Sequence, residues 1–357
     1  MNLVVIGAGP AGWTAAKKIR MNDPGSRVLI FDAGKDGFYA KIRLPEYLAG
    51  KLERKRLLIA SPEQMAASGV EVHTDEKIVS FDPVKKTILS GDGREYGYDK
   101  LILATGASAR LPSVPGMEST ARVLTLRKIE DADAIAGFCT ESGRALVLGG
   151  GLLGLEAAAA LKERGMNVVI LECQNRLLPR QLTEKESAFL YEEFQARGFT
   201  VKLGVNVKRV EAQPGKGTGV ASSLPTENPD ASLRAELDSG EILEADLMLV
   251  SAGIQSETAL AAAAGLKVQR GIVVDDTLRT SAPDVYAIGD CAELNGTVAG
   301  LWVAAKDQGE ALGEILCGKR ASFASPPYSP QLKIPGIDLN ELRRKASASG
   351  NGEGEGA

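Results

Sequence analysis

The sequence has little of the chemistry that metal sites and disulfide frameworks need. Its 357 residues include one histidine, His73, and four cysteines. No two cysteines are spaced as a C-x-x-C pair or a zinc clip. This scarcity argues against a metal site and favours a reducing compartment, so we expect no metal and a cytoplasmic protein. The cysteines are Cys139, Cys173, Cys291 and Cys317.

The chain also lacks long apolar runs and blocks of charge of one sign. No hydrophobic stretch approaches the roughly 18 residues of a membrane span. A strand-like run begins at Leu3, which leaves no room for a signal peptide. The formal net charge is −4 with both signs mixed, so we expect no nucleic-acid or membrane partner. The length predicts two or three domains.

Glycine is present in a pattern with a physical meaning. The apolar run 3–6 is followed by Gly7-Ala8-Gly9-Pro10-Ala11-Gly12, which reads G-x-G-x-x-G and opens a helix-compatible stretch. The first glycine permits a tight turn, the second lets the backbone approach a pyrophosphate, and the third lets the helix lie close to the strand. A second strand ends in Asp32, 25 positions after Gly7 (32 − 7), where an acid meets ribose hydroxyls. The alternative is a tight strand–helix turn without a ligand.

The same pattern occurs again after a Pro- and Gly-containing linker near 112–116. The strand 145–148 leads into Gly149-Gly150-Gly151-Leu152-Leu153-Gly154 and an alanine-rich helix. The next strand ends in Glu172, 23 positions after Gly149 (172 − 149). Two such patterns, each with an acid in place, predict that the chain binds two dinucleotides.

The remaining segments alternate between short strands and turns. We expect further strands at 70–73, 77–81, 87–89, 100–106, 246–251 and 285–288. The stretch 213–232 is rich in Gly, Ser, Pro and Thr and predicts a mobile surface loop. The stretch 345–357 predicts a disordered tail.

Four motifs in this order carry a resemblance to a family. They are the two glycine patterns, Ala104-Thr105-Gly106, and the run 280–290, T-S-A-P-D-V-Y-A-I-G-D. From about 3 to 342 the sequence resembles the FAD-dependent pyridine nucleotide-disulfide oxidoreductase superfamily, related to glutathione reductase. The resemblance implies an α/β fold with two Rossmann-like domains. The FAD-binding domain would comprise 1–108 and 246–325, with an NAD(H)-binding domain at 109–245, a short C-terminal segment at 326–344 and the tail at 345–357.

The resemblance implies FAD-binding roles at matched positions. Asp32 would bind the adenosine ribose, and Ile78 would offer its backbone to the adenine. Asp290 would hold the ribityl chain and the pyrophosphate edge. Trp302, at the start of the helix-like run 302–316, would lie near the pyrimidine edge of the flavin, with ordinary core packing as the alternative. The implied FAD-binding residues are Gly7, Gly9, Pro10, Ala11, Gly12, Asp32, Ile78, Ala104, Thr105, Gly106, Gly289, Asp290 and Trp302.

The resemblance also implies a nicotinamide dinucleotide site around the second glycine pattern. A carboxylate at Glu172 favours the free 2′-hydroxyl of NADH, while Arg176 keeps NADPH as the disfavoured alternative. Glu156 would lie near the nicotinamide carboxamide, with a solvated helix carboxylate as the alternative. The implied NADH-binding residues are Gly149, Gly151, Leu152, Gly154, Glu172 and Gly253.

A missing thiol selects the branch of the family. Ile42 stands where related enzymes carry a redox cysteine. The loop 39–46 is similar to the Y-x-R-x-R-L-x-E of NADH:rubredoxin oxidoreductases, with Lys41 as its departure. We therefore take Lys41, Arg43 and Glu156 as candidate catalytic residues. Dioxygenase-type ferredoxin reductases usually carry lysine at the position of Glu46, so Glu46 argues against that group. The run 332–337 is similar both to the NADH:rubredoxin oxidoreductases and to the flavin part of assimilatory nitrite reductases.

These observations predict an FAD-dependent NADH oxidoreductase without a redox-active disulfide. Nicotinamide would give hydride to the flavin, and a small electron-carrier protein would receive the electrons, with rubredoxin as the favoured carrier. We expect a monomer or weak dimer, and a basic run at 51–56 as a candidate docking surface, with a solvated helix face as its alternative. The rival functions are an NADH oxidase using oxygen, a ferredoxin reductase, a separate flavin subunit of a nitrite-reductase-like system, and a non-catalytic NADH sensor.

Overall fold

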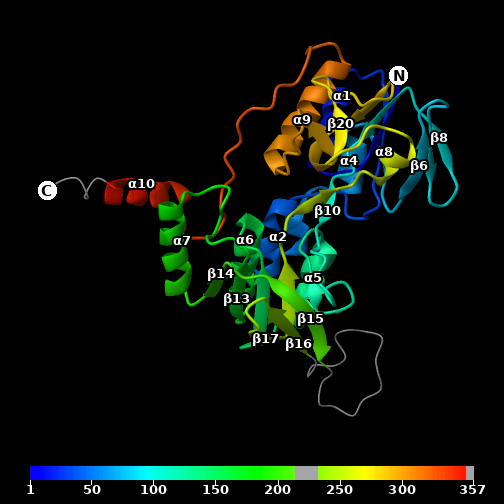
Figure 1. Cartoon of the computed structure of the whole chain (residues 1–357). Helices are drawn as coiled ribbons and strands as arrows, with labels where there is room; N and C mark the ends of the chain where they lie inside the picture. Colours follow the sequence, from blue (N-terminus) through cyan, green and yellow to red (C-terminus); the bar gives the residue numbers. More distant parts are fainter. Residues whose placement is uncertain (214–231, 351–357) are drawn as a thin grey trace, which may run out of the picture. The chain divides into compact units, whose positions relative to one another are not determined.

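The chain folds into two compact α/β units, each assembled from segments that are distant in the sequence (Figure 1). The computed structural model describes residues 1–213 and 232–350. The first unit comprises Met1–Ala40, Lys55–Ser108 and Ile254–Ser329. The second comprises Lys41–Arg54, Ala109–Gly253 and the chain from Pro330 onward. The predicted fold class, α/β with two Rossmann-like domains, is confirmed.

The first unit is built on a five-stranded parallel sheet in the order β21-β9-β1-β2-β5. Its central strands are short apolar runs with both faces covered, as parallel strands require. Strand β1 pairs with β2 on one side and with β9 on the other, so the strand order reverses at β1. In open parallel sheets, ligands bind at the carboxyl ends of the strands next to such a reversal. The strands are β1 (Asn2–Ile6), β2 (Arg27–Phe31), β5 (Glu71–His73), β9 (Lys100–Leu103) and β21 (Val285–Ala287).

Helix α1 (Pro10–Asn22) packs closely on helix α9 (Trp302–Leu316), whose range agrees with the helix expected there. Gly309 and Gly313 lie one turn apart on the contact face. A Cβ at Gly309 would lie 2.5 Å from the Ala11 carbonyl oxygen, and one at Gly313 would lie 2.6 Å from the Lys18 Cβ. The two helices therefore approach to a distance that only glycine permits, which ties α9 to the helix that follows the first glycine pattern.

Smaller elements complete the first unit. The three antiparallel strands β6-β7-β8 form one small sheet, and the pairs β3-β4, β10-β19 and β20-β22 form three others. The elements are β3 (Phe38–Tyr39), β4 (Leu58–Ala60), β6 (Ile78–Asp82), β7 (Thr87–Ser90), β8 (Glu95–Gly97), β10 (Ala107–Ala109), β19 (Ile254–Ser256), β20 (Ile272–Val274), β22 (Ala292–Leu294), α3 (Arg54–Leu57), α4 (Pro62–Ala67) and α8 (Ala259–Ala263).

The second unit repeats the parallel architecture in the order β11-β18-β12-β13-β14. Antiparallel strands β15-β16-β17 form a second sheet that shares its core. The elements are β11 (Val123–Leu124), β12 (Arg144–Leu148), β13 (Asn167–Glu172), β14 (Thr200–Leu203), β15 (Val207–Gln213), β16 (Ser232–Leu237), β17 (Ile242–Ala245), β18 (Leu247–Val250), α2 (Leu44–Leu48), α5 (Ile129–Phe138), α6 (Leu152–Glu163), α7 (Glu184–Ala196) and α10 (Leu339–Gly350).

The first unit breaks off at Ser108, where the expected boundary lies, but its later part begins at Ile254 and not at 246. Strand β18 is fully buried and pairs with both β11 and β12, so it belongs to the second sheet. The chain accordingly returns to the first unit at Ile254. The segment Lys41–Arg54 also belongs to the second unit, where the Tyr47 hydroxyl donates to Asp133 at 2.6 Å and Arg164 Nε donates to the Leu48 carbonyl at 2.6 Å.

The C-terminal segment packs on the second unit. Leu339 and Leu342 on α10 are buried, and α10 packs against α7. Helix α10 runs to Gly350, so it extends into the stretch from Lys345 that was expected to be disordered. Residues 351–357, and residues 214–231 of the expected mobile loop, lie outside the described residues. Within the described part of the chain, no helix combines the length and the apolar character needed to cross a bilayer.

Candidate functional site

The first glycine pattern forms the turn between β1 and α1. Gly7 has φ +110°, and a Cβ there would lie 2.2 Å from the Ala104 carbonyl oxygen. A Cβ at Gly12 would lie 2.0 Å from the Gly7 carbonyl oxygen. The fold itself therefore demands glycine at both positions. Gly9 is different, because a Cβ there would have no neighbour within 4 Å. The open space beside Gly9 is what close approach of a ligand to the backbone needs.

The helix that follows this turn starts without a side-chain cap. Gly9 is the N-cap of α1 and makes no side-chain hydrogen bond, and Pro10 occupies the first turn, where its missing N–H costs nothing. The backbone amides at the start of α1 form the positive end of the helix dipole. Such an end binds a phosphate group.

Asp32 lies beside this turn, as its spacing predicted. Its Oδ2 accepts the Ala8 N–H at 2.6 Å, and its Oδ1 accepts the Gly34 N–H at 2.7 Å. The carboxylate therefore braces the loop from the end of the neighbouring strand. This structural duty adds to the ribose role that the resemblance implies.

Other predicted FAD-binding residues meet at the same edge of the sheet. Residues 104–106 follow β9 and residues 289–290 follow β21, and both strands run parallel to β1. Gly289 has φ +79°, and its N–H donates to the buried Gln308 Oε1 at 2.7 Å. The Ser256 hydroxyl donates to the Asp290 carbonyl at 2.7 Å. The parallel sheet thus brings together residues that are almost 300 positions apart in the chain.

Trp302 and Ile78 occupy well-defined places in the first unit. Trp302 is the first residue of α9, whose N-cap Leu301 provides no side-chain cap. Its ring stacks on Phe38 with centroids 5.5 Å apart and planes at 9°. Ile78 opens β6, is buried, and stands opposite Ser90 in β7. Their contacts with a flavin remain predictions.

The second glycine pattern has the same geometry as the first. Gly149 has φ +120°, and a Cβ there would lie 2.4 Å from the Ser251 carbonyl oxygen. A Cβ at Gly154 would lie 2.0 Å from the Gly149 carbonyl oxygen. Gly151 caps α6 without a side-chain hydrogen bond, and a Cβ there would have no neighbour within 4 Å. Leu152 is the first residue of α6.

Glu172 repeats the contacts of Asp32. Its Oε2 accepts the Gly150 N–H at 2.6 Å, and its Oε1 accepts the Gln174 N–H at 2.8 Å. In both units the acid binds the residue after the first glycine and the residue two positions beyond itself. Gly253, at φ +102°, follows β18 at the same edge of the second sheet and is open to a ligand at its Cβ position. Arg176 is engaged by Glu184 and the Pro179 carbonyl, both at 3.3 Å.

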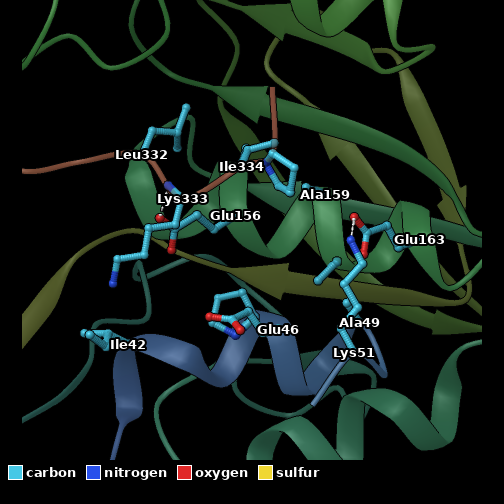
Figure 2. A pocket seen from close by; sticks show the side chains of 13 residues that line it. Ile42, Glu46, Ala49, Lys51, Glu156, Ala159, Glu163, Leu332, Lys333 and Ile334 are labelled. Atoms are coloured by element: carbon cyan, nitrogen blue, oxygen red, sulfur yellow. Dashed lines mark hydrogen bonds and ion pairs between the residues drawn. The ribbon is translucent and has the colours of Figure 1, made fainter. Parts of the chain in front are cut away.

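A pocket of about 430 Å³ lies within the second unit, between α2, α6 and the C-terminal segment (Figure 2). Helix α6 contributes four residues spaced as one helix face. The pocket is lined mainly by apolar side chains, with charged groups at both ends. Its lining residues are Ile42, Pro45, Glu46, Ala49, Lys51, Glu156, Ala159, Ala160, Glu163, Leu332, Lys333, Ile334 and Pro335.

The charged groups of this pocket are held by hydrogen bonds and ion pairs. Glu156 Oε1 accepts the Lys333 N–H at 2.8 Å. Burial raises the pKa of Glu156, and the Lys333 N–H and the positive charge of Lys333 offset this only in part. Arg43 donates to Glu46 at 2.6 Å and holds the pKa of Glu46 below its usual range. Lys51 pairs with Glu163 at 2.6 Å.

The structure places the three candidate catalytic residues differently. Glu156 lines the pocket, whereas Lys41 and Arg43 form a 3-10 turn before α2 and are absent from the lining. Glu46 and Lys333 line it without having been predicted as site residues. Both lie in motifs that the resemblance singled out, but no sequence pattern says that these motifs meet.

Two basic side chains of the run at 51–56 form ion pairs with nearby carboxylates. Besides the Lys51–Glu163 pair, Arg54 contacts Asp133 at 2.9 Å and Glu130 at 3.6 Å. Two of its cations are thus neutralised by helices of their own unit, which weakens its candidacy as a docking surface. In the part of the chain that the structure describes, no cluster of three or more His, Cys, Asp or Glu side chains is placed to hold a metal ion.

Known proteins resemble this chain over most of its length. The assimilatory nitrate reductase electron transfer subunit of Bacillus subtilis (strain 168) is 32% identical over 339 residues, which is 94% of this chain and 42% of that protein. The chain thus spans about two fifths of that relative. The rubredoxin-NAD(+) reductase of Pseudomonas putida is 31% identical over 334 residues, 92% of this chain and 83% of that protein.

Solved structures and a family comparison agree with these relatives. The crystal structure of the covalent putidaredoxin reductase–putidaredoxin complex matches with a TM-score of 0.82 at 28% identity, over 93% of this chain and 79% of that chain. Residues 1–309 match the family described as pyridine nucleotide-disulphide oxidoreductase. The cofactor prediction of FAD with NADH is confirmed at the level of this family. The chain belongs to the pyridine nucleotide-disulphide oxidoreductase family.

Proposed function

We propose that the chain is an FAD-dependent NADH oxidoreductase that passes electrons to a small carrier protein, with rubredoxin as the favoured carrier. One observation carries the proposal. Each unit has a glycine turn at the carboxyl edge of a parallel sheet, and in each turn the second glycine alone faces open space. Two turns of this kind suit two dinucleotides, and electron transfer between two dinucleotides is the chemistry of this family.

FAD is assigned to the first unit. The amides at the start of α1 would hold its pyrophosphate beside Gly9, and Asp32 would accept from the adenosine ribose. Asp32 already accepts two backbone N–H groups, but a carboxylate has about four lone-pair sites, so a ribose hydroxyl can still donate to it. Helix α9 starts at Trp302 without a side-chain cap. The positive end of its dipole would therefore be available to stabilise negative charge on the flavin ring.

NADH is assigned to the second unit. Glu172 is buried and accepts two backbone N–H groups, so its carboxylate is held where it would meet the ribose 2′-oxygen of the dinucleotide. A 2′-phosphate would be repelled there. Arg176 is engaged with Glu184 and the Pro179 carbonyl, which leaves it poorly placed to accept that phosphate. Both observations support NADH over NADPH.

FAD, when bound, accepts a hydride from nicotinamide and releases electrons singly. The protein contributes binding and orientation. Glu156 would accept a hydrogen bond from the carboxamide of the nicotinamide. A thiol relay has no support among the four free cysteines, since burial raises the pKa of each of their thiols, away from the reactive thiolate.

The choice of carrier rests on the relatives. The rubredoxin-NAD(+) reductase of Pseudomonas putida is matched over 83% of its length, whereas the nitrate reductase subunit is matched over 42%. The first case suits a chain that acts on a separate carrier. The second supports an alternative, in which the chain is the flavin part of a nitrate- or nitrite-reducing system.

The experiment is a comparison of electron acceptors. The purified protein should contain FAD, and anaerobic NADH should bleach its visible flavin absorbance. Reoxidation is then followed by stopped flow with rubredoxin, ferredoxin, a dye and oxygen. Rubredoxin should reoxidise the flavin fastest. Oxygen as the fastest acceptor would establish an oxidase, and a flavin that NADH does not bleach would refute the proposed oxidoreductase.

A further inference from the structure

The C-terminal stretch Leu332–Pro335 forms one wall of the pocket in Figure 2. Leu332 and Ile334 are buried, so their side chains fasten the stretch to the second unit. Arg197 Nη1 donates to the Pro335 carbonyl at 2.8 Å, and Ile337 N–H donates to the Ile334 carbonyl at 3.1 Å in a turn. The wall is therefore held in place on both sides of Lys333.

The stretch is also anchored from further along the chain. Helix α10 begins at Leu339 and packs against α7, and its side chains Leu339 and Leu342 are buried. Arg197, at the end of α7, is itself oriented by Glu193 at 2.7 Å. A continuous set of contacts thus runs from α7 through the C-terminal segment to the pocket.

Lys333 meets Glu156 at the pocket. Its backbone N–H donates to Glu156 Oε1 at 2.8 Å across 177 positions of sequence. The charged groups facing Glu156 come from two other elements, Glu46 on α2 and Lys333 itself. The positive charge of Lys333 favours the ionised form of both carboxylates, while Glu46 disfavours it at Glu156. Arg43 compensates Glu46, and Lys51 compensates Glu163 at the other end.

We infer that the C-terminal segment completes the nicotinamide site, with Lys333 as a positioning residue that holds the Glu156 carboxylate ready to accept a hydrogen bond from a carboxamide. The inference rests on the proposed NADH function. A glutamate on a helix face has several rotamers, and a backbone N–H on one oxygen selects a single orientation. The other oxygen then faces the ligand as an acceptor, because an ionised carboxylate accepts at both oxygens.

The test is calorimetric titration of the flavinated protein with NAD⁺ between acidic and neutral pH. NAD⁺ carries the same carboxamide as NADH and gives no turnover with oxidised flavin, so affinity is read directly. Protonation of Glu156 removes the acceptor, so NAD⁺ affinity should fall on acidification. Lys333→Ala removes the charge that favours the carboxylate, so this acidic limb should move up by about half a pH unit.

Further variants separate the charge of Lys333 from its backbone N–H. Lys333→Arg keeps both and should behave as the parent. Lys333→Pro removes both the charge and the N–H, so its difference from Lys333→Ala reports the N–H alone; it should weaken NAD⁺ binding about tenfold relative to Lys333→Ala at neutral pH, as expected for one hydrogen bond to a charged group. Lys345→Ala removes a lysine of the same segment that pairs with Glu341 on α10, and it should change nothing.

The outcomes distinguish this inference from the proposed function. Glu156→Gln should abolish the acidic limb, because an amide does not titrate in this range. If Glu156→Gln changes the profile but Lys333→Ala and Lys333→Pro do not, Lys333 does not position Glu156 and the inference is overturned. If Glu156→Gln leaves the profile unchanged, the proposed role of Glu156 fails. If the parent protein does not bind NAD⁺ at all, the proposed function fails.

Discussion

The glycine turns allow a paired perturbation, Gly9→Val and Gly151→Val, in which each variant controls for the other. Both glycines have ordinary backbone angles, φ −69° and −80°, that valine adopts easily. A Cβ at either position would meet no atom within 4 Å. The added side chain therefore enters open space, which is where the pyrophosphate is proposed to lie.

The expected magnitudes separate folding from binding. Valine is a poorer N-cap than glycine, which costs up to about 1 kcal/mol of stability. A displaced pyrophosphate loses at least two backbone hydrogen bonds to a charged group, each about 1.5 kcal/mol or more, or about 100-fold in affinity. Gly12→Ala is the contrasting variant, because its Cβ would lie 2.0 Å from the Gly7 carbonyl oxygen and should damage the fold itself.

The assays are the flavin content of the purified protein, thermal unfolding, and calorimetric titration with NAD⁺. Gly9→Val should be folded and colourless. Gly151→Val should remain yellow and bind NAD⁺ about 100-fold more weakly than the parent. A Gly9→Val protein with normal flavin content would refute the assignment of FAD to the first turn. A colourless Gly151→Val protein that binds NAD⁺ normally would reverse the two assignments.

Three further predictions follow from the same contacts. NADH should exceed NADPH by at least about tenfold in kcat/KM, or about 1.4 kcal/mol, and Glu172→Arg should narrow that preference; equal efficiency of the two coenzymes in the parent would contradict the role of Glu172. Replacing all four cysteines should leave NADH-to-carrier electron transfer largely intact, and a folded, flavinated variant that reduces no acceptor would show that a thiol is needed. Because the folded-state pKa of Glu156 is raised, its contribution to stability is present at low pH and lost as pH rises through that pKa. Glu156→Gln should therefore raise the melting temperature at neutral and higher pH but not at acidic pH, and an equal change at every pH would count against this reasoning.

Local sequence determined the elements that bind dinucleotides. Gly12 and Gly154 are required by contacts within a single strand–turn–helix unit, with the carbonyl oxygens of Gly7 and Gly149, and Gly7 and Gly149 adopt the positive φ of the tight turn itself. Such contacts depend on backbone sterics and on apolar runs of a few residues, so a pattern in the sequence reveals them. The strand near 285–288 and the helix at 302–316 were predicted for the same reason.

The sequence did not predict for every segment which of the two units it would join. Strand β18 looks like any buried strand, and only its pairing between β11 and β12 places it in the second sheet. The segment Lys41–Arg54 interrupts the first unit in sequence, but its side chains bind α5 and α6 of the second. The amphipathic helix α10 extends beyond Lys345 because buried leucines dock it, whereas its composition alone suggested disorder.

The sequence by itself thus determined the family, the two dinucleotide turns and the acid that accompanies each turn. The tertiary structure alone decided what surrounds Glu156, because the hydrogen bond from Lys333 joins residues 177 positions apart. It also revealed that Asp32 and Glu172 brace their own glycine loops. Turns and strands follow from interactions between near neighbours in the chain, whereas pockets and paired charges arise where distant segments pack together, and no short pattern records that meeting.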